Sequence, residues 1–479
     1  MAELVEKLQE SFEGMIVKKS SLQGVFSSLN LPAFIRDWFL KKYADKDGSV
    51  NVNFVLEKIK DVMPRKDEWN ALLDKLLSGE KVRFLAKIII DIDIKTQEIT
   101  FAIPDFGVSK TQTYIPKSVW DKHKKELLVT DGEFWGILDL EYKQINDGKK
   151  QVGKISLVDF KDFRPYKIDL NFFREARKNF EIDEWIDVLL GAIDYNAKGF
   201  KDENQKITML TRLLPFVEER LNLMELAPKG TGKSYIFSQI SKKGWLVSGG
   251  VMTRAKMFYD MNKRQDGLVT YYDYVALDEI STIKFPDIDE MRGAMKGYLE
   301  SGTFNVGNKS GSGKAGVVLL GNIKEAKMDV NSNMLDELPP LFEDSALIDR
   351  FHGFIKGWDV PRMNEDMKVN DWALNTEYFS EIMHALREDV ISKALVDELI
   401  EVPKDADTRD TKAVKRIATA YMKLFFPHWT NIDDVDKELF KKYCLERAVE
   451  MRKIIKIQLG IMDTEFKKRP MQEFKLKGE

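Results

Sequence analysis

The most informative stretch of this chain reads Leu221-Asn222-Leu223-Met224-Glu225-Leu226-Ala227-Pro228-Lys229-Gly230-Thr231-Gly232-Lys233-Ser234. Its apolar half predicts a buried strand, its glycine-rich half predicts a tight turn, and the residues that follow predict a helix. Backbone N–H groups of such a turn, together with the helix dipole, form a cradle for nucleotide phosphates. Ala227 departs from the usual motif G-x-x-x-x-G-K-[ST] only at its first glycine, a position that mainly serves the turn. We therefore predict a phosphate loop made of Pro228, Lys229, Gly230, Thr231, Gly232, Lys233 and Ser234.

Within this loop, Lys233 is expected to reach the β- and γ-phosphates and Ser234 to help hold Mg²⁺. Two later apolar runs end in polar residues that suit nucleotide hydrolysis. The run 274–277 ends in Asp278, which suits Mg²⁺ coordination, and Glu279, which suits polarisation of the attacking water. The run 316–321 ends in Asn322, which we interpret as a sensor of the γ-phosphate. The adjacent acid pair favours an ATPase over other nucleotide-binding proteins.

Arg350 follows a single predicted helical turn, 347–349. An arginine at such a place can be inserted by a neighbouring subunit against the charge of the transition state. That arrangement requires a ring or filament of subunits. A structural salt bridge is the alternative interpretation of the same residue.

Outward from the phosphate loop, the periodicity of apolar residues changes several times along the chain. Alternating helices and strands from 205 to 360 predict a mostly parallel sheet. Further upstream, Asn146-Asp147-Gly148 between two alternating runs is a strong hairpin signal and predicts a small barrel or sandwich, for which a spacer or oligomerisation module is the alternative. We expect five regions, namely an α-helical cap (1–80), an OB-like β-barrel that binds DNA (81–168), a helical linker (169–204), the α/β core (205–365) and a helical lid with a tail (366–479).

Composition excludes several classes of protein. A chain of 479 residues that is 43% hydrophobic and 32% charged is too large for one small module. No apolar run is long enough for a membrane helix and no signal peptide is evident, so we expect a cytoplasmic protein without a membrane partner. The lone Cys444 forms no intrachain disulfide, and four histidines argue against a Cys/His zinc site. A net charge of −3 still permits nucleic acid binding, because a local basic loop suffices.

The order of these motifs resembles that of AAA+ ATPases, and more closely the ATPase region of the BrxL family, Lon-related proteins of BREX bacteriophage-defence systems. The resemblance covers residues 205–425 and is carried by the loop 227–234, by Leu277-Asp278-Glu279, and by Asp349-Arg350-Phe351-His352-Gly353. It implies an AAA+ core with a helical lid and the cofactors ATP and Mg²⁺. The family's likeness to MCM replicative helicases implies a homo-oligomeric ring around double-stranded DNA, expected to be a hexamer, single or paired. The BrxL resemblance itself implies other BREX defence proteins as partners. Arg409 matches the sensor-2 arginine of the lid, with Arg416 as the alternative.

Residues 299–316 lie where MCM-like ATPases place a hairpin in the central pore. Two predicted strand pieces flank a glycine-serine tip that carries Lys309 and Lys314, which we expect to contact DNA phosphates. A mobile solvated loop is the alternative. The resulting expectation is a ring-forming, ATP-dependent DNA translocase in antiphage defence; the rivals are a Lon-related unfoldase or chaperone without peptidase activity, and a nucleotide-gated scaffold. Because the chain stops at Glu479 soon after the lid, proteolysis is not expected.

Overall fold

The computed structural model describes residues 2–19, 31–45, 47–93, 96–127, 133–147, 150–262 and 265–478. The chain forms two compact units, a larger one of Met1–Trp38 with Ile168–Glu479 and a smaller one of Phe39–Lys167. The helical segment expected over 1–80 is therefore divided between them. Helix α3 (Ala33–Tyr43) contains the point of division.

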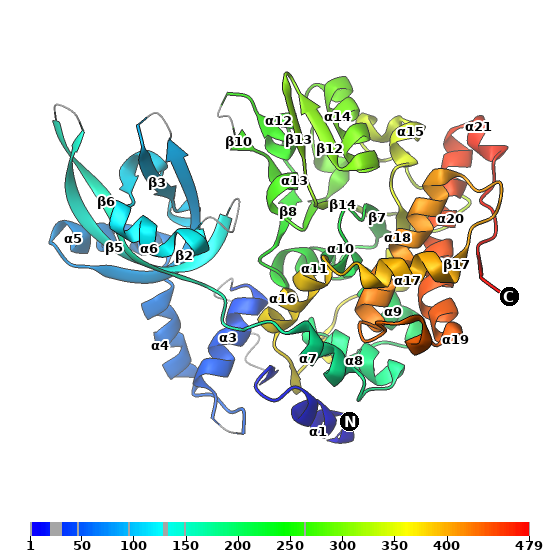
Figure 1. The fold of residues 1–479 in the computed structure, drawn as a ribbon, viewed down its shortest axis with the longest axis horizontal. Coiled ribbons are helices and arrows are strands. Elements are labelled where there is room, and N and C mark those ends of the chain that lie inside the picture. Colours follow the sequence, from blue (N-terminus) through cyan, green and yellow to red (C-terminus); the bar gives the residue numbers. More distant parts are fainter. Residues whose placement is uncertain are drawn as a thin grey trace. The chain divides into compact units, whose positions relative to one another are not determined.

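A five-stranded sheet forms the centre of the larger unit (Figure 1). Its strand order is β15-β7-β14-β11-β8, and every neighbouring pair is parallel. This mixed α/β core confirms the predicted class. The strands are β7 (Leu223–Ala227), β8 (Gly244–Ser248), β11 (Tyr274–Asp278), β14 (Gly316–Asn322) and β15 (Gly353–Lys356).

Because these strands are parallel, segments that follow a strand lie at the carboxyl end of the sheet and segments that precede one lie at its amino end. The phosphate loop, Asp278 and Asn322 end or follow strands, whereas Arg350 precedes β15 and the segment 299–315 precedes β14. The topology therefore separates the predicted site residues into two groups.

Helices flank this sheet before and between its strands. They are α7 (Leu170–Arg177), α8 (Ile182–Ala192), α9 (Glu203–Thr211), α10 (Leu214–Val217), α11 (Lys233–Gln239), α12 (Arg254–Met257), α13 (Leu268–Tyr271), α14 (Ile288–Ser301) and α15 (Ser345–Ile348). A second helical group follows the sheet, and it comprises α16 (Thr376–Leu386), α17 (Ile391–Leu399), α18 (Thr408–Phe425), α19 (Lys437–Phe440), α20 (Glu446–Met462) and α21 (Thr464–Lys467). Short strand pairs complete the unit, namely β9 (Tyr259–Asp260) with β10 (Gln265–Asp266), and β17 (Ile400–Glu401) with β18 (Lys475–Leu476).

Helix α18 shows how local sequence places a functional side chain. Asp407 caps the helix, since its carboxylate accepts a hydrogen bond of 2.7 Å from the backbone N–H of Arg409. Val414, Ile417 and Tyr421 are buried at helical spacing and hold the helix against the rest of the unit. Arg409 therefore sits in the first turn of a well-anchored helix.

The N-terminal segment joins the larger unit through contacts that are distant in sequence. After α1 (Ala2–Ser11), β1 (Ile16–Lys18) pairs antiparallel with β16 (Trp372–Leu374). Lys19, which is fully buried, then forms ion pairs of 3.3 Å with Asp37 and 2.8 Å with Asp194. Strand β1 was not expected, because β16, with which it pairs, lies more than 350 residues away.

The smaller unit contains a five-stranded sheet in the order β3-β2-β5-β6-β4. Its elements are α4 (Val52–Val62), α5 (Trp69–Leu77), β2 (Val82–Asp93), β3 (Glu98–Ala102), β4 (Thr113–Tyr114), α6 (Lys117–Leu127), β5 (Glu133–Asp147) and β6 (Lys150–Asp162). The predicted hairpin is confirmed by the antiparallel pairing of β5 with β6, although Gly148 in its turn lies outside the described residues.

The two outer strands of this sheet are themselves linked. The N–H of Ile115 donates to the carbonyl of Ile99 at 2.8 Å, and the N–H of Phe101 donates to the hydroxyl of Thr113 at 2.9 Å. The sheet therefore curls until its outer strands meet around an apolar core that includes Phe84, Phe101, Leu138, Leu157 and Phe160. Among the described residues, no helix combines the length and apolar composition that crossing a membrane demands.

Candidate active site

The phosphate loop has the predicted form of strand, turn and helix. It leaves β7 at Ala227 and enters α11 at Lys233, with Gly230 and Gly232 in the left-handed region at φ +81° and +76°. Glycine is favoured at both positions for this reason. At Gly232 space is limiting as well, because an added Cβ would lie 2.5 Å from the hydroxyl of Tyr195.

Four predicted residues meet at the carboxyl end of the sheet. The Lys233 ammonium lies 3.4 Å from the Asn322 side-chain oxygen and 3.3 Å from the Pro228 carbonyl. The Ser234 hydroxyl donates to the Asp278 carboxylate at 2.5 Å. Burial lowers the pKa of Lys233 from its usual value. A lysine partly stripped of water gains from an anionic ligand, and a nucleotide phosphate is such a ligand.

Glu279 lies beside this group in an unusual backbone conformation. Its φ of +50° is left-handed, and its N–H donates to the Asp278 carboxylate at 2.9 Å. Non-glycine residues in this region are strained and concentrate at functional sites. The side chain of Glu279 is exposed, so it is open to water and ligand.

The Mg²⁺ that a nucleotide brings fits the donors present. Ser234 and Asp278 offer a hydroxyl and a carboxylate, and Mg²⁺ prefers oxygen ligands and completes its octahedron with phosphates and water. When bound, the ion neutralises phosphate charge. The chain's own residues would position the phosphates, and Glu279 would present a carboxylate to water.

A buried ion pair beneath the loop was missed by sequence reasoning. Arg212 and Glu225 are both fully buried and approach to 2.6 Å, while another guanidinium nitrogen of Arg212 donates to the Thr231 carbonyl at 2.7 Å. The pair therefore connects β7 to the turn of the phosphate loop. A charged residue inside the otherwise apolar run 223–227 was the signal that could have revealed it.

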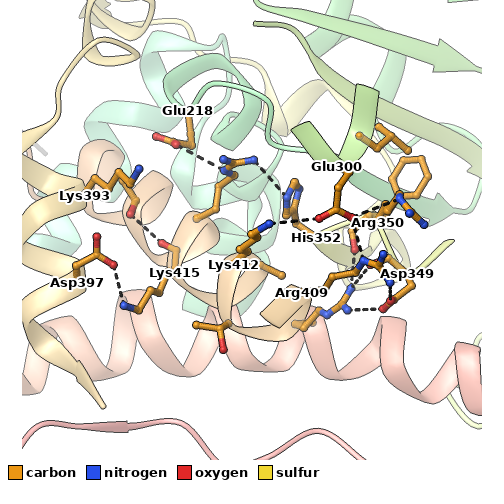
Figure 2. A pocket seen from close by; sticks show the side chains of 17 residues that line it. Glu218, Glu300, Asp349, Arg350, His352, Lys393, Asp397, Arg409, Lys412 and Lys415 are labelled. Atoms are coloured by element: carbon orange, nitrogen blue, oxygen red, sulfur yellow. Dashed lines mark hydrogen bonds and ion pairs between the residues drawn. The ribbon is translucent and has the colours of Figure 1, made fainter. Parts of the chain in front are cut away.

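Arg350 and Arg409 lie together at the amino end of the sheet, in a pocket of 330 Å³ (Figure 2). The pocket is lined by seven Lys or Arg side chains and four Asp or Glu side chains, so it carries an excess of positive charge. Among the described residues, none of the phosphate-loop residues contributes to its lining. The sequence places Arg350 correctly after one helical turn, but within one chain it does not join the nucleotide group.

A fully buried arginine holds this pocket in shape. Arg452, from α20, donates to the Asp349 carboxylate at 2.6 Å and to the Asp410 carboxylate at 2.7 Å. It also donates to the Phe351 carbonyl at 2.8 Å. The turn that carries Arg350 is thereby tied to helix α18, which carries Arg409.

Arg416, the alternative sensor-2 residue, lines the same pocket and lies 3.4 Å from the His352 ring. Burial, with the nearby charges of Arg416 and Arg452, lowers the pKa of His352 well below its usual value. The neutral ring accepts a hydrogen bond of 2.9 Å from the Asn222 N–H. Both arginine candidates therefore lie at the amino end of the sheet.

The hairpin of residues 303–312 is present, but its tip differs from the expectation. Strands β12 (Thr303–Val306) and β13 (Lys309–Ser312) pair antiparallel, so the turn is Gly307-Asn308 and the Gly-Ser segment is itself a strand. The reason is packing, because a Cβ at Gly311 would lie 2.5 Å from the Phe304 ring opposite it. Lys309 follows the tip, whereas Lys314 follows the hairpin and pairs with Glu219 at 2.8 Å.

A parallel α/β core with a phosphate loop, an acidic strand end and an amide at one end of its sheet defines the AAA+-like class of ATPase cores. Comparison with known families narrows this class. The model described as "Lon-like protease BrxL-like, ATPase domain" matches residues 155–472, and "BREX system Lon protease-like protein BrxL N-terminal" matches residues 10–142. The chain belongs to the BrxL family, whose ATPase domain implies nucleotide binding.

Two curated relatives agree with this assignment. The "Lon-like protease BrxL" of Escherichia coli O9:H4 (strain HS) is 31% identical over 458 residues, which cover 94% of this chain and 64% of the relative. The protein of the same name from Bacillus cereus (strain H3081.97) is 30% identical over 448 residues, which cover 92% of this chain and 65% of the relative. The chain thus spans just under two thirds of the length of these relatives.

Proposed function

We propose that this protein is a ring-forming motor that hydrolyses ATP and moves on double-stranded DNA in BREX bacteriophage defence. The defence role rests on the family, whose N-terminal model is described as part of the BREX system. In this proposal the curled sheet of the smaller unit is an OB-like DNA-binding barrel, α16 to α20 form the lid, and Arg409 serves as sensor 2.

The placement of the site residues at two ends of the sheet is the main support for a ring of subunits. Lys233, Ser234 and Asp278 lie at the carboxyl end of the sheet, while Arg350 and Arg409 lie at its amino end. Strand β7 between the two ends has five residues and spans about 16 Å, so these arginines do not reach their own chain's nucleotide by a change of rotamer. A second copy that sets its amino end against the first copy's phosphate loop supplies both arginines and closes the active site. Repetition of this heterologous contact produces a ring when its rotation closes and a helical filament when it does not, and the family resemblance favours the ring.

The hairpin favours DNA over polypeptide as the substrate of this motor. Its turn consists of Gly307 and Asn308, and the neighbouring Val306 is buried, so the turn itself offers amide groups, and the Lys309 ammonium beside it lies 5.3 Å from the Tyr259 ring. Lys309 lies next to the tip and is exposed. A small polar tip with a cation suits contact with a phosphate backbone without base recognition.

Complementation between two inactive variants tests the shared active site. Glu279→Gln is expected to bind ATP without hydrolysing it, and Arg350→Ala to lose hydrolysis as well. In a 1:1 mixture, random assembly leaves about a quarter of the interfaces with both native residues, so about a quarter of wild-type activity should return. No recovery in mixed rings would contradict the shared site.

The choice of substrate is tested by ATPase assays with duplex DNA, single-stranded DNA or casein. We expect stimulation by duplex DNA, and stimulation by casein alone would favour the unfoldase instead. Lys309→Ala and Lys314→Ala should weaken DNA binding and lower the salt slope by about one each. Lys178→Ala, which removes an exposed lysine paired with Glu175, is the matched control and should leave both unchanged.

A further inference from the structure

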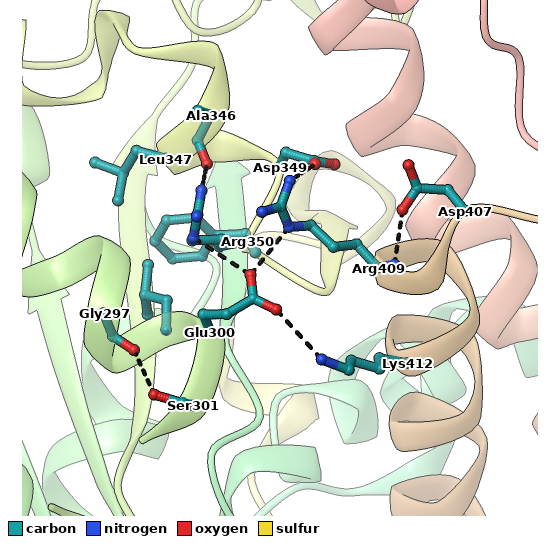
Figure 3. A network of polar contacts seen from close by, with 12 residues as sticks. Gly297, Glu300, Ser301, Ala346, Leu347, Asp349, Arg350, Asp407, Arg409 and Lys412 are labelled. Atoms are coloured by element: carbon teal, nitrogen blue, oxygen red, sulfur yellow. Dashed lines mark hydrogen bonds and ion pairs between the residues drawn. The ribbon is translucent and has the colours of Figure 1, made fainter. Parts of the chain in front are cut away.

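Glu300 lines the pocket that holds Arg350 and Arg409 (Figure 3), and it stands three residues before strand β12 of the hairpin. Its carboxylate accepts a hydrogen bond of 3.0 Å from Arg409 and one of 3.3 Å from Lys412. The same carboxylate lies 3.4 Å from the Nε of Arg350. One half-buried acid thus faces three cations that belong to two different elements of the chain.

These contacts hold both arginines against their own subunit. One terminal nitrogen of Arg350 donates to the Ala346 carbonyl of the preceding turn, and its Nε is turned toward Glu300. One terminal nitrogen of Arg409 donates to the Asp349 carboxylate at 2.9 Å. Both guanidinium groups therefore donate hydrogen bonds to groups of their own chain. To bind a phosphate of a neighbouring chain, they must give up the shared carboxylate.

Without Glu300, the two guanidinium groups would repel each other. The pKa of Arg350 is lowered, first by burial and next by the positive charge of Arg409. The Nε of Arg350 is buried and makes no hydrogen bond, so its ion pair with Glu300 is a loose one. Loose ion pairs at half-exposed sites are weak and can be exchanged for another anion.

The backbone connects Glu300 directly to the hairpin. Glu300 and Ser301 end α14, Gly302 caps it at φ +76°, and β12 starts at the next residue. The Gly313 N–H donates to the Gly302 carbonyl at 2.9 Å and closes the base of the hairpin.

A second link comes from the other arm of the hairpin. The hydroxyl of Tyr298, which is also on α14, donates to the Ala315 carbonyl at 2.8 Å. The last turn of α14 is therefore linked to both arms of the hairpin. That turn carries the carboxylate that restrains both arginines.

We propose that Glu300 is a positioning residue that couples the hairpin to the arginines. It holds Arg350 and Arg409 on their own subunit until DNA displaces the hairpin, and the shift of α14 then frees both arginines for the neighbouring chain's phosphates. This inference rests on the proposed function, because it assumes that DNA engages the hairpin and that the arginines act across the interface.

Glu300→Gln tests the coupling, because it keeps the shape of the side chain and removes its charge. ATP hydrolysis without DNA should rise about twofold to fivefold, the range that the loss of one weak ion pair supports. The ratio of the rates with and without DNA should fall to near one. DNA affinity should not fall, because Lys309 and Lys314 are untouched and DNA no longer acts against the restraint. Glu300→Asp keeps the charge on a shorter side chain and should give an intermediate ratio.

Glu290→Gln is the matched control, since it removes one carboxylate, paired with Arg254, from the other end of the same helix. It should keep the wild-type ratio. A purely structural role for Glu300 would lower both rates and the unfolding midpoint together, and that result overturns the proposal. So does a wild-type ratio in Glu300→Gln when the wild-type enzyme is stimulated by DNA. If the wild-type enzyme ignores DNA, the proposed function fails along with the coupling.

Discussion

Glu225→Gln examines the ion pair under the phosphate loop, and its consequence can be worked out from the structure. The carboxylate of Glu225 accepts three hydrogen bonds from Arg212, at 3.2, 3.0 and 2.6 Å, and both side chains are fully buried. The glutamine keeps the shape but leaves the charge of Arg212 without its counter-ion. Removing one partner of a buried pair costs about 3–5 kcal/mol. For a unit as large as this one, the midpoint should fall by about 4–7 °C, given an unfolding entropy of about 2.1 cal/mol/K per residue.

The same ion pair also positions the phosphate loop, and a measurement of stability alone does not test this role. Arg212 donates to the Thr231 carbonyl at 2.7 Å and so fixes the turn that faces the phosphates. The double variant Arg212→Met with Glu225→Leu removes both charges, and apolar replacements of a buried pair often restore stability. We expect its unfolding midpoint to return close to that of the wild-type protein while its ATP affinity stays low.

Two measurements decide the matter, namely thermal unfolding and ATP binding by calorimetry. A loss below about 1 kcal/mol in Glu225→Gln would refute the assignment of an isolated buried charge. Wild-type ATP affinity in the double variant would show that Arg212 does not position the loop.

Three further outcomes follow from single residues. Because the pKa of His352 is lowered in the folded protein, only the unfolded chain binds a proton there just below about pH 6.5. The free energy of unfolding should therefore decrease, as the pH is lowered, by up to about 1.4 kcal/mol per pH unit. His352→Asn should remove this dependence, as measured by denaturant unfolding at several pH values. Tyr235→Phe takes one donor from the buried carboxylate of Asp194 and should lower the free energy of unfolding by about 1.5–3 kcal/mol, measured with urea. Gly311→Val forces side-chain atoms into the Phe304 ring and should cost about 1–3 kcal/mol, with faster proteolysis of the hairpin as the readout.

The features that sequence predicted are those that short stretches encode. The strand, turn and helix of the phosphate loop and the pairing of β5 with β6 both follow from periodicity or turn chemistry in short stretches of sequence. The hairpin tip was misplaced because Gly311 signals a turn locally. Only its register opposite Phe304 shows that it is a strand residue with no room for a side chain.

The contacts that organise the site were not visible in this way. Arg212 finds Glu225 across 13 residues, but Glu300 meets Arg409 across 109 residues and Lys19 meets Asp194 across 175. Charged residues are usually exposed, so a short stretch of sequence predicts a surface position for them. Here they are buried or half-buried because each forms an ion pair with a residue distant in sequence. Charged residues inside apolar runs, such as Glu225, are the exception that a sequence does display.

The division of the site between two ends of the sheet was nevertheless implicit in the order of the motifs. Asp278 and Asn322 come after their strands, while Arg350 comes before its own, and in a parallel sheet this order alone assigns them to opposite ends. In the proposed ring, a chain built in this way completes its active site only with a neighbouring copy. The arginines and the hairpin share the amino end of the sheet, so in the proposed ring a signal from the hairpin would reach the next chain's nucleotide before its own. On this proposal, coupling between neighbouring subunits is a consequence of strand direction, and Glu300 determines the strength of that coupling.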